Sequence, residues 1–360
     1  MLNRRYVNLA GALQKFGAGA LLCSLIVFAD TSASADEPQG DPPVQLAPNR
    51  SDEPLADEFS LPSAVRFLEH SSLAWTRDRQ CFTCHTNFLF LMASPEHEPD
   101  NAAHLEIRQA LESMVTERWP ISGPRWDAEV VMAAATLAIN DRRTTGQLHE
   151  TTRVALERMW SVQRADGSID WLKCGWPPME SDDDFGVAMM ALAVGAAPEE
   201  YQRSEAAIAG LQRIRDYLDT HPAPTLHHGA MLLWADSYLD DDLLTPQERS
   251  QTIAALIELQ KTDGGWSAAT LGDWTRADGG EQDTTHSDAY GSAFVTFVLQ
   301  RCDSEAHEEP IERGLDWLRT NQRASGRWFA RSLNRDNAHY LSHAASAFAV
   351  LALSEELSPE

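Results

Sequence analysis

The sequence predicts an all-α protein, an (α/α)6 toroid of six helix hairpins, because one turn motif recurs between segments of helical period. Its three copies begin at Gln163, Gln260 and Gln322, and the second reads Gln-Lys-Thr-Asp-Gly-Gly-Trp. Each copy follows a segment with apolar residues at helical spacing and precedes, after a loop, a segment rich in small and apolar residues. The copies lie 97 and 62 residues apart, and the longer interval corresponds to two units of about 48 residues.

Filling the gaps between these turns gives six helix pairs, each an outer helix followed by an inner one. The outer helices carry charges on one side, whereas the inner ones are apolar on most faces and are therefore expected to be buried. A closed ring fits this pattern better than an open solenoid, whose ends need polar capping repeats. Outer helices are expected to begin near Leu61, Asn101, Leu148, Arg203, Pro246 and Glu308, and inner helices near Cys84, Asp127, Asp182, Leu226, Ser287 and Asn337.

The long loops of the predicted toroid belong to one rim. Parallel inner helices place all their N-termini there, together with the loops at residues 164–181, 262–286 and 323–336. Helix N-termini supply positive dipole ends and free N–H groups. We therefore expect the functional site on this rim.

Composition excludes several classes of protein. The chain has 360 residues, a mass of 39.9 kDa and a net charge of −25. Phosphates would be repelled over most of such a surface, so we expect no nucleic-acid partner. A hydrophobic content of 43% with 11 Trp is too apolar for a disordered chain.

The N-terminal 35 residues predict a secretory signal peptide. Arg4, Arg5 and Lys15 precede an apolar stretch over residues 16–29, and Ala-Ser-Ala at residues 33–35 fits the cleavage pattern. An uncleaved anchor is the alternative, although the stretch is shorter than the roughly 20 residues that span a bilayer. We expect export to the periplasm, the cell surface or the medium, with no stable membrane span after cleavage.

Two further segments complete the predicted domain organisation. Residues 36–58 contain five prolines among acidic and polar residues, which predicts a flexible tether. Residues 59–360 form the toroid.

The Gln-x-x-Asp-Gly-x-Trp turn resembles the repeat of the squalene/hopene cyclase and protein prenyltransferase superfamily. The resemblance covers most of residues 61–356 and implies the (α/α)6 toroid of that superfamily. It says much less about the reaction, because one fold supports many functions.

An acidic run resembles the motif with which squalene–hopene cyclases start carbocation chemistry. Asp182, Asp183 and Asp184 open the third inner helix, and the resemblance implies that Asp183 or a neighbour is a catalytic acid. The run departs from the family pattern, because Ser181 replaces the first Asp and Phe185 with the following Gly replaces Thr-Ala. A helix cap that interacts with the helix dipole is the alternative role.

The prenyltransferases bind zinc through Asp, Cys and His, and part of that set is present here. Asp288 and His343 resemble the Asp and the His, but Tyr290 stands where the Cys would be. The resemblance therefore implies only an incomplete zinc site.

Cys81-Phe82-Thr83-Cys84-His85 fits the pattern of c-type haem attachment. In such sites the two thiols bond to the haem and the His ligates the iron, and attachment takes place outside the cytoplasm. A Cys-x-x-Cys disulfide and a metal site with a rim His are the alternatives. Further candidate ligands are His227, His228 and His343.

These patterns lead to one functional hypothesis and two alternatives. The first is a toroid with a covalent haem c at its mouth, active in redox chemistry or electron transfer on or near a hydrophobic, isoprenoid-like ligand and served by a redox partner. The second is a haem-free, terpenoid-cyclase-like isomerase or lyase that uses Asp183 as its acid. The third is a non-catalytic toroid that binds a ligand or a protein. Whether the protein is an enzyme is left open, as is any pairing of Cys174 with Cys302.

Overall fold

The computed structural model describes residues 48–94, 101–303, 306–336 and 339–355. Over these ranges the chain is helical apart from turns, loops and isolated β-bridges, which confirms the all-α prediction. The predicted signal peptide and residues 36–47 of the predicted tether lie outside the described residues. Among the helices of the described ranges, none is long and apolar enough to span a bilayer.

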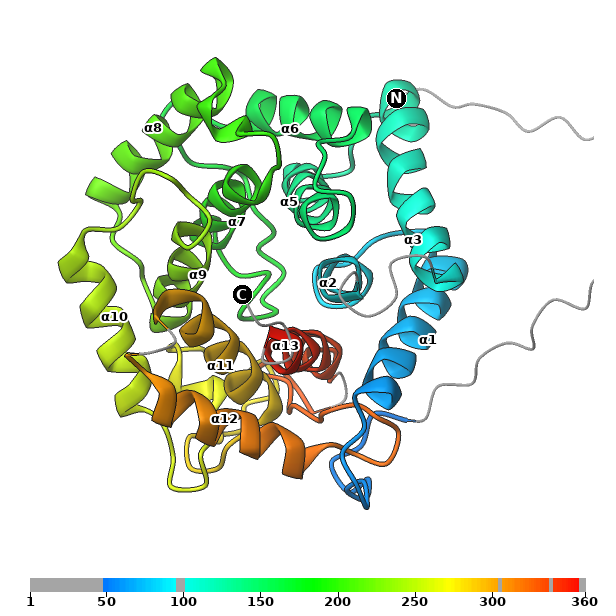
Figure 1. Cartoon of the computed structure of the whole chain (residues 1–360), viewed down its shortest axis with the longest axis vertical. Helices are drawn as coiled ribbons and strands as arrows, with labels where there is room; N and C mark the ends of the chain where they lie inside the picture. The colour runs from blue at the N-terminus through cyan, green and yellow to red at the C-terminus, as the bar shows by residue number, and fades with distance from the viewer. Residues whose placement is uncertain (1–47, 95–100, 304–305, 337–338, 356–360) are drawn as a thin grey trace, which may run out of the picture. The chain divides into compact units, whose positions relative to one another are not determined.

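The helices form two concentric rings, as Figure 1 shows. Most outer helices begin within two residues of the predicted positions, and the last inner helix begins four residues after Asn337. The outer ring consists of α1 (Leu61–Arg79), α3 (Ala102–Ser113), α6 (Glu150–Val162), α8 (Glu205–Thr220), α10 (Pro246–Glu258) and α12 (Glu308–Asn321). The inner ring consists of α2 (Asn87–Ala93), α5 (Asp127–Thr144), α7 (Asp183–Ala196), α9 (Leu226–Asp236), α11 (Ala289–Asp303) and α13 (Leu341–Glu355).

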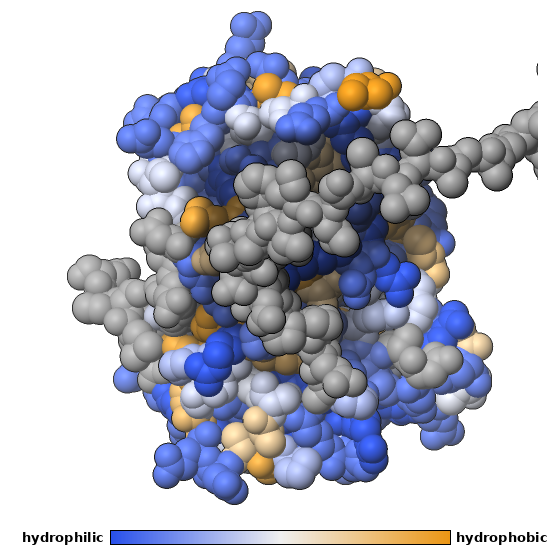
Figure 2. Space-filling model, turned by 90° about the vertical axis from the view of Figure 1, so that its right-hand side faces the viewer, coloured by the Kyte–Doolittle hydropathy of each residue, from blue (hydrophilic) through white to orange (hydrophobic). Residues whose placement is uncertain are grey.

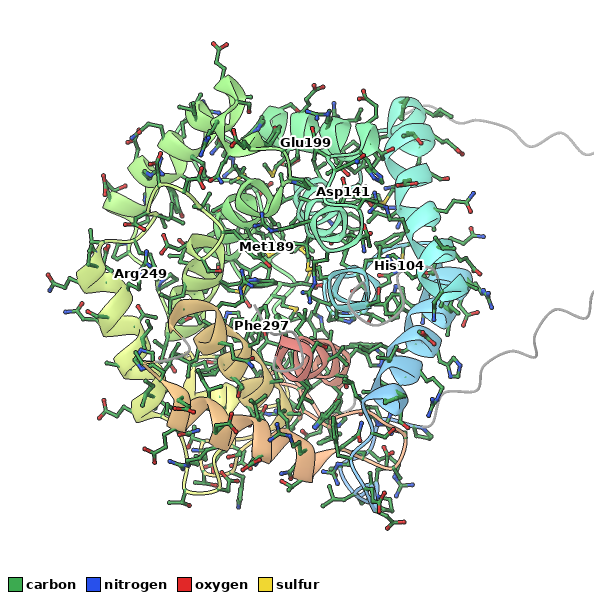
Figure 3. All side chains as sticks on the ribbon, in the orientation of Figure 1. His104, Asp141, Met189, Glu199, Arg249 and Phe297 are labelled. Atoms are coloured by element: carbon green, nitrogen blue, oxygen red, sulfur yellow. The ribbon has the colours of Figure 1, made fainter. Side chains whose placement is uncertain are left out.

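The inner ring is closed and its interior is filled by side chains. Each inner helix packs on the next, and α13 packs on both α11 and α2. Trp234 of α9 contacts Phe297 of α11 and Phe348 of α13, with ring centroids 5.3 and 5.6 Å apart. Figure 3 shows Phe297 and Met189 among the inner helices and Arg249 on the outer ring. We expect this apolar packing to make the largest favourable contribution to the free energy of folding, because the hydrophobic contribution grows with the apolar area that is buried.

Polar contacts join the outer ring to the inner ring where α3 faces α5. The buried Arg108 donates to Asp141 over 2.6 Å, and Asp141 also accepts from the Thr152 hydroxyl over 2.6 Å. Figure 3 shows Asp141 and His104 on this side of the molecule. Because the carboxylate has several donors, its charge is compensated inside the protein.

The outer face that carries α1 and α3 is mostly hydrophilic, with hydrophobic residues in separate spots (Figure 2). This matches the amphipathic character predicted for the outer helices.

In each of its three copies, the repeated turn contacts the next outer helix around the ring through a glutamine. Gln163 donates to the Gly210 carbonyl of α8 over 3.1 Å, and Gln260 donates to the Pro310 carbonyl of α12 over 2.8 Å. Gln322 donates to the Ser60 carbonyl over 2.9 Å and accepts from its N–H over 2.7 Å. Because Ser60 caps α1, the third copy joins the end of the ring to its beginning.

A glycine in each turn allows this close approach. Gly167, Gly264 and Gly326 have φ values of +87°, +91° and +92°, where residues with a Cβ are strained. A Cβ at these positions would also overlap a backbone carbonyl of the adjacent outer helix, at Arg213, Arg313 and Ser63 respectively.

Residues 48–58, which we name the N-terminal strap, are packed rather than flexible, contrary to the prediction for this part of the tether. Glu53 accepts from Arg327 over 2.7 Å, and its carbonyl accepts from Arg323 over 2.7 Å. Ala56 donates to the Gln322 carbonyl over 2.8 Å. Proline content predicted flexibility, but these distant partners fix the segment on the last rim loop.

We predict that Gly326→Ala destabilises the protein more than Gly146→Ala. Both glycines have positive φ, but a Cβ at Gly146 meets nothing within 4 Å. The backbone conformation alone should cost about 1–2 kcal/mol in each variant, and overlap with the Ser63 carbonyl should add about 1–3 kcal/mol at Gly326. Chemical unfolding measures both free energies, and equal losses would show that the close approach contributes nothing.

Candidate active site at the mouth of the toroid

The N-termini of the inner helices meet at one end of the toroid, which we call the mouth. Hydrogen bonds connect residues at or next to these ends on neighbouring helices. His228 of α9 contacts Asp182 before α7 over 2.8 Å, and His343 of α13 contacts Thr86 before α2 over 2.9 Å. The prediction that long loops and inner N-termini share one rim therefore agrees with these contacts.

A cavity of about 170 Å³, the mouth cavity, opens between the rim loops. Aromatic side chains form part of its wall, with Trp176 and Tyr340 at a centroid distance of 6.2 Å. Its lining residues are His85, Trp176, Pro177, Pro178, Met179, Glu180, Ser332, Tyr340 and Leu341.

Glu180 brings a carboxyl group to the mouth cavity from a short hairpin. Its N–H donates to the Trp176 carbonyl over 3.0 Å, and its carbonyl accepts from Gly175 over 3.1 Å. Burial raises the pKa of Glu180, and a hydrogen bond from the Cys174 thiol acts against this increase. Glu180 therefore retains its proton to a higher pH than an exposed glutamate does.

The pKa of Asp182, two residues further on, is shifted in the opposite direction. Its side chain caps α7 by accepting from Phe185 N–H, and it is 2.8 Å from His228 Nε2. Burial favours protonation of Asp182, but the hydrogen bonds from His228 and from the backbone outweigh it and lower the pKa. His228 is in turn positioned by Thr225, 2.7 Å from its Nδ1.

The other two members of the acidic run have structural partners. Asp183 accepts from the Trp171 N–H over 2.9 Å and forms an ion pair with Lys173 over 2.5 Å. Asp184 accepts from the Tyr217 hydroxyl over 3.1 Å. The capping alternative is therefore realised at Asp182, while Asp183 and Asp184 hold the rim loop and α8 against the start of α7.

The sequence did not single out Glu180. Its position inside a long rim loop, two residues before the acidic run, was the available signal. Its raised pKa depends on burial by residues from other hairpins, which local sequence does not reveal.

The Cys-x-x-Cys-His segment is packed against the mouth cavity, and its histidine has several partners. His85 has both ring nitrogens in hydrogen bonds, with Thr83 over 2.9 Å and with Thr86 over 3.0 Å. Its ring stacks on Tyr340 at 4.8 Å, and burial, together with a smaller electrostatic contribution from the nearby His343, lowers its pKa to about 3. Ligation of an iron atom by His85 would therefore require one of these hydrogen bonds to be replaced.

Cys81, Cys84 and Cys174 are free thiols, and the two cysteines of the motif differ in their surroundings. Cys84 is buried, and burial raises its pKa, whereas Cys81 lines a separate cavity of about 480 Å³. Cys302 is 13 residues along α11 from its mouth end, about 20 Å by helix geometry. Cys174 lies at the mouth beside Glu180, so it does not approach Cys302.

The residues suggested for zinc also have other partners. Asp288 accepts from three backbone N–H groups, those of Ala268, Tyr290 and Gly291, and burial raises its pKa to about 6 against these bonds. His227 is buried, contacts the Tyr290 hydroxyl over 2.8 Å and has a strongly lowered pKa because of burial. Within the described ranges, no three His, Cys, Asp or Glu side chains are grouped as a metal site.

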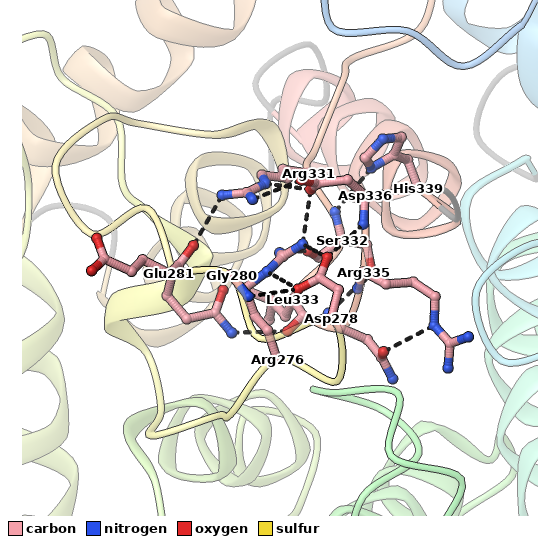
Figure 4. Close-up of polar contacts among 12 residues, drawn as sticks. Arg276, Asp278, Gly280, Glu281, Arg331, Ser332, Leu333, Arg335, Asp336 and His339 are labelled. Carbon is pink, nitrogen blue, oxygen red and sulfur yellow. Dashed lines mark hydrogen bonds and ion pairs between the residues drawn. The ribbon is translucent and has the colours of Figure 1, made fainter.

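Two rim loops are held together by a buried arginine (Figure 4). Arg276 donates to Asp278 over 2.6 Å, to Asp336 over 2.8 Å and to the Ser332 carbonyl over 2.5 Å. Arg331 also contacts Asp336, over 2.9 Å. The hydrogen bond from Arg276 holds the pKa of Asp278 well below its usual range. This network fixes Ser332 and the loop that leads to Tyr340.

Comparison with known proteins supports the fold. No family model and no curated protein matches the chain. A solved structure from Klebsiella pneumoniae, described as a possible member of the GH105 family, has a TM-score of 0.52 and 13% identity, and the match covers 87% of this chain and 98% of that one. A similar protein from Salmonella enterica has the same score and identity, with coverages of 82% and 93%. A glycosidase in complex with glucose has a TM-score of 0.53 and 15% identity, with coverages of 83% and 98%.

These neighbours support the toroid that the cyclase and prenyltransferase resemblance implied, but they contradict the functional hypotheses. They are carbohydrate-active proteins by description, rather than haem redox proteins or isoprenoid-binding ones. The geometry agrees, because aromatic side chains fill the inner ring. The haem-based redox function and the terpenoid-cyclase and binding-scaffold alternatives are therefore withdrawn, whereas attachment of haem c at Cys81 and Cys84 stays a prediction. Export stays a prediction.

We predict that Cys174→Ala raises the pKa of Glu180 further. The thiol hydrogen bond favours the ionised carboxylate, so its loss should shift the titration of Glu180 to higher pH. Carbon-13 NMR of labelled glutamate would follow this titration. Cys174→Ser is the matched control, because its hydroxyl keeps a donor and should leave the titration close to that of the unaltered protein. An unchanged titration in the Ala variant would contradict the role of Cys174.

Proposed function

We propose that the protein hydrolyses glycosidic bonds at the mouth cavity, with Glu180 as general acid and Asp182 as general base. The observation that carries the proposal is the presence of two carboxyl groups, two residues apart, whose environments move their pKa values in opposite directions. Pairs of this kind divide the acid and base roles in enzymes. Glu180 lines an aromatic-walled cavity, which supports a binding site beside the reactive pair.

The chemistry follows from the two protonation states. Hydrolysis of a glycosidic bond needs a proton for the departing oxygen and a carboxylate that activates water or attacks the sugar. The raised pKa of Glu180 favours the protonated form, which can donate, and the lowered pKa of Asp182 favours the ionised form, which can accept. His228 holds the Asp182 carboxylate in place over 2.8 Å and is itself held by Thr225. His228 is therefore a positioning residue in this scheme.

The walls of the mouth cavity suit a sugar ring. Trp176 and Tyr340 offer aromatic surface, while Ser332 and Glu180 offer polar groups, which is the usual mixture in small-molecule sites. Trp176 is kept in position by the Arg335 guanidinium, 5.0 Å from its ring centroid. The pyranose would lie against aromatic surface on its apolar side and meet hydrogen-bonding groups at its edge.

The structural neighbours add support of a limited kind. Proteins described as possible GH105 members and a glycosidase that binds glucose share the fold at 13–15% identity. At this level of identity the likeness concerns the fold alone. The proposed substrate class therefore depends mainly on the residues that line the mouth cavity.

We predict that Glu180→Gln abolishes glycan hydrolysis by the full-length protein. Loss of a general acid lowers kcat by roughly 10²–10⁴-fold, and an amide cannot supply the proton. Activity would be measured as reducing ends released from a panel of neutral and acidic oligosaccharides and polysaccharides. Ultraviolet absorbance of unsaturated products would be followed in parallel to detect a lyase reaction.

Glu281→Gln is the matched control, because Glu281 is an exposed carboxyl on the same rim and contributes only its carbonyl to Arg331. It should retain full activity. Asp182→Asn should lose activity like Glu180→Gln, while thermal unfolding confirms that both variants remain folded. Full activity in the folded Glu180→Gln variant would refute the proposal.

A further inference from the structure

A second cavity lies beside the mouth cavity and has not been given a role. It measures about 660 Å³ and is bordered by the N-terminal strap on one side and by the start of α13 on the other. We name it the strap cavity. Its lining residues are Asn49, Arg50, Ser51, Asp52, Asp336, His339, Tyr340 and His343.

Tyr340 separates the strap cavity from the mouth cavity, because it lines both. Hydrogen bonds also connect a residue of the mouth cavity with a residue of the strap cavity. Thr86 lies 3.0 Å from His85 Nδ1, in the mouth cavity, and 2.9 Å from His343 Nδ1, in the strap cavity. A ligand longer than one sugar ring could therefore pass over Tyr340 from one cavity to the other.

The charged groups of the strap cavity are already paired. Arg50 donates to Asp52 over 2.8 Å, and Asp336 accepts from Arg276 over 2.8 Å and from Arg331 over 2.9 Å. A charged ligand would have to compete with these pairs. The cavity therefore favours a ligand without a charge of its own.

Neutral polar groups remain available to such a ligand. Asn49 uses its NH2 group to donate to the His339 carbonyl over 2.5 Å, and its Oδ1 is buried with no hydrogen-bond partner. His343 uses Nδ1 for Thr86, and burial lowers its pKa to about 4, so the ring is neutral at physiological pH. An unpaired buried acceptor costs free energy until a donor reaches it. Hydroxyl groups both donate and accept, and they fit both positions.

We infer that the strap cavity is a second sugar subsite, which takes a neutral residue, and that the substrate is an oligosaccharide of at least two residues lying across Tyr340. This inference rests on the proposed function. Asn49 is assigned as a specificity-determining residue, because it lines the strap cavity and its Oδ1 has no hydrogen-bond partner. The strap thus completes the binding site in addition to packing on the last rim loop.

The test uses the full-length Glu180→Gln protein, which should bind substrate without turning it over. Calorimetric titration would compare mono-, di- and trisaccharides of the gluco, galacto, manno and xylo series. We expect at least a tenfold gain in affinity from monosaccharide to disaccharide in one series. Adding Ser51→Trp, which fills the strap cavity from an exposed position, should remove that gain and leave monosaccharide affinity unchanged. Asn49→Ala should reduce the same gain.

Ser161→Trp is the matched control, because it places an equally large side chain on exposed α6 and should preserve the gain. Two results would overturn the inference alone: a disaccharide that binds no more tightly than its monosaccharide, or a gain that survives Ser51→Trp in a folded protein. Absence of binding by every sugar, combined with absence of glycan hydrolysis by the unaltered protein, would overturn the proposed function itself.

Discussion

The close contact between each rim turn and an outer helix is the constraint on which the rest of the structure depends. A glycine at positive φ brings the turn against a helix carbonyl, and a glutamine side chain hydrogen-bonds across the same junction. At Gln322 and Gly326 the partner is the beginning of α1, so the contact that spaces the hairpins also closes the ring. Once closed, the ring has no exposed end, and the inner helices exclude water along their whole circumference.

Closure also determines where chemistry can take place. The interior is filled by aromatic side chains such as Trp234, Phe297 and Phe348, so a ligand binds outside the inner ring, and the mouth offers such a place. At the mouth, the loops between the helices are long enough to form cavities. Arg276 holds two of these loops together, because it donates hydrogen bonds to Asp278 in one and to Asp336 in the other. A carboxylate–arginine contact also holds the N-terminal strap, because Arg327 of the last rim loop donates to Glu53 of the strap. The mouth cavity and the strap cavity are therefore parts of one rigid surface.

The fold was predictable because its determinants are local and repeated. Three copies of the turn and the contrast between outer and inner segments were sufficient to place six helix pairs, most within a few residues. The site was less predictable because its properties depend on distant partners. Cys81 to His85 matched a haem motif, yet Tyr340, from the other end of the chain, stacks on His85, and neighbouring threonines occupy its nitrogens. Asp182 was found through the acidic run, whereas Glu180 gave no local signal of its burial.

The two carboxyls of the mouth show how position relative to a helix end decides protonation. Asp182 caps α7, so a backbone N–H and His228 compensate its charge despite partial burial. Glu180 precedes the helix by three residues, where its backbone is used in the hairpin with Trp176 and a single thiol is its side-chain partner. Burial therefore dominates at Glu180, and compensation dominates at Asp182. Two carboxyl groups that are two residues apart thus have pKa values shifted in opposite directions.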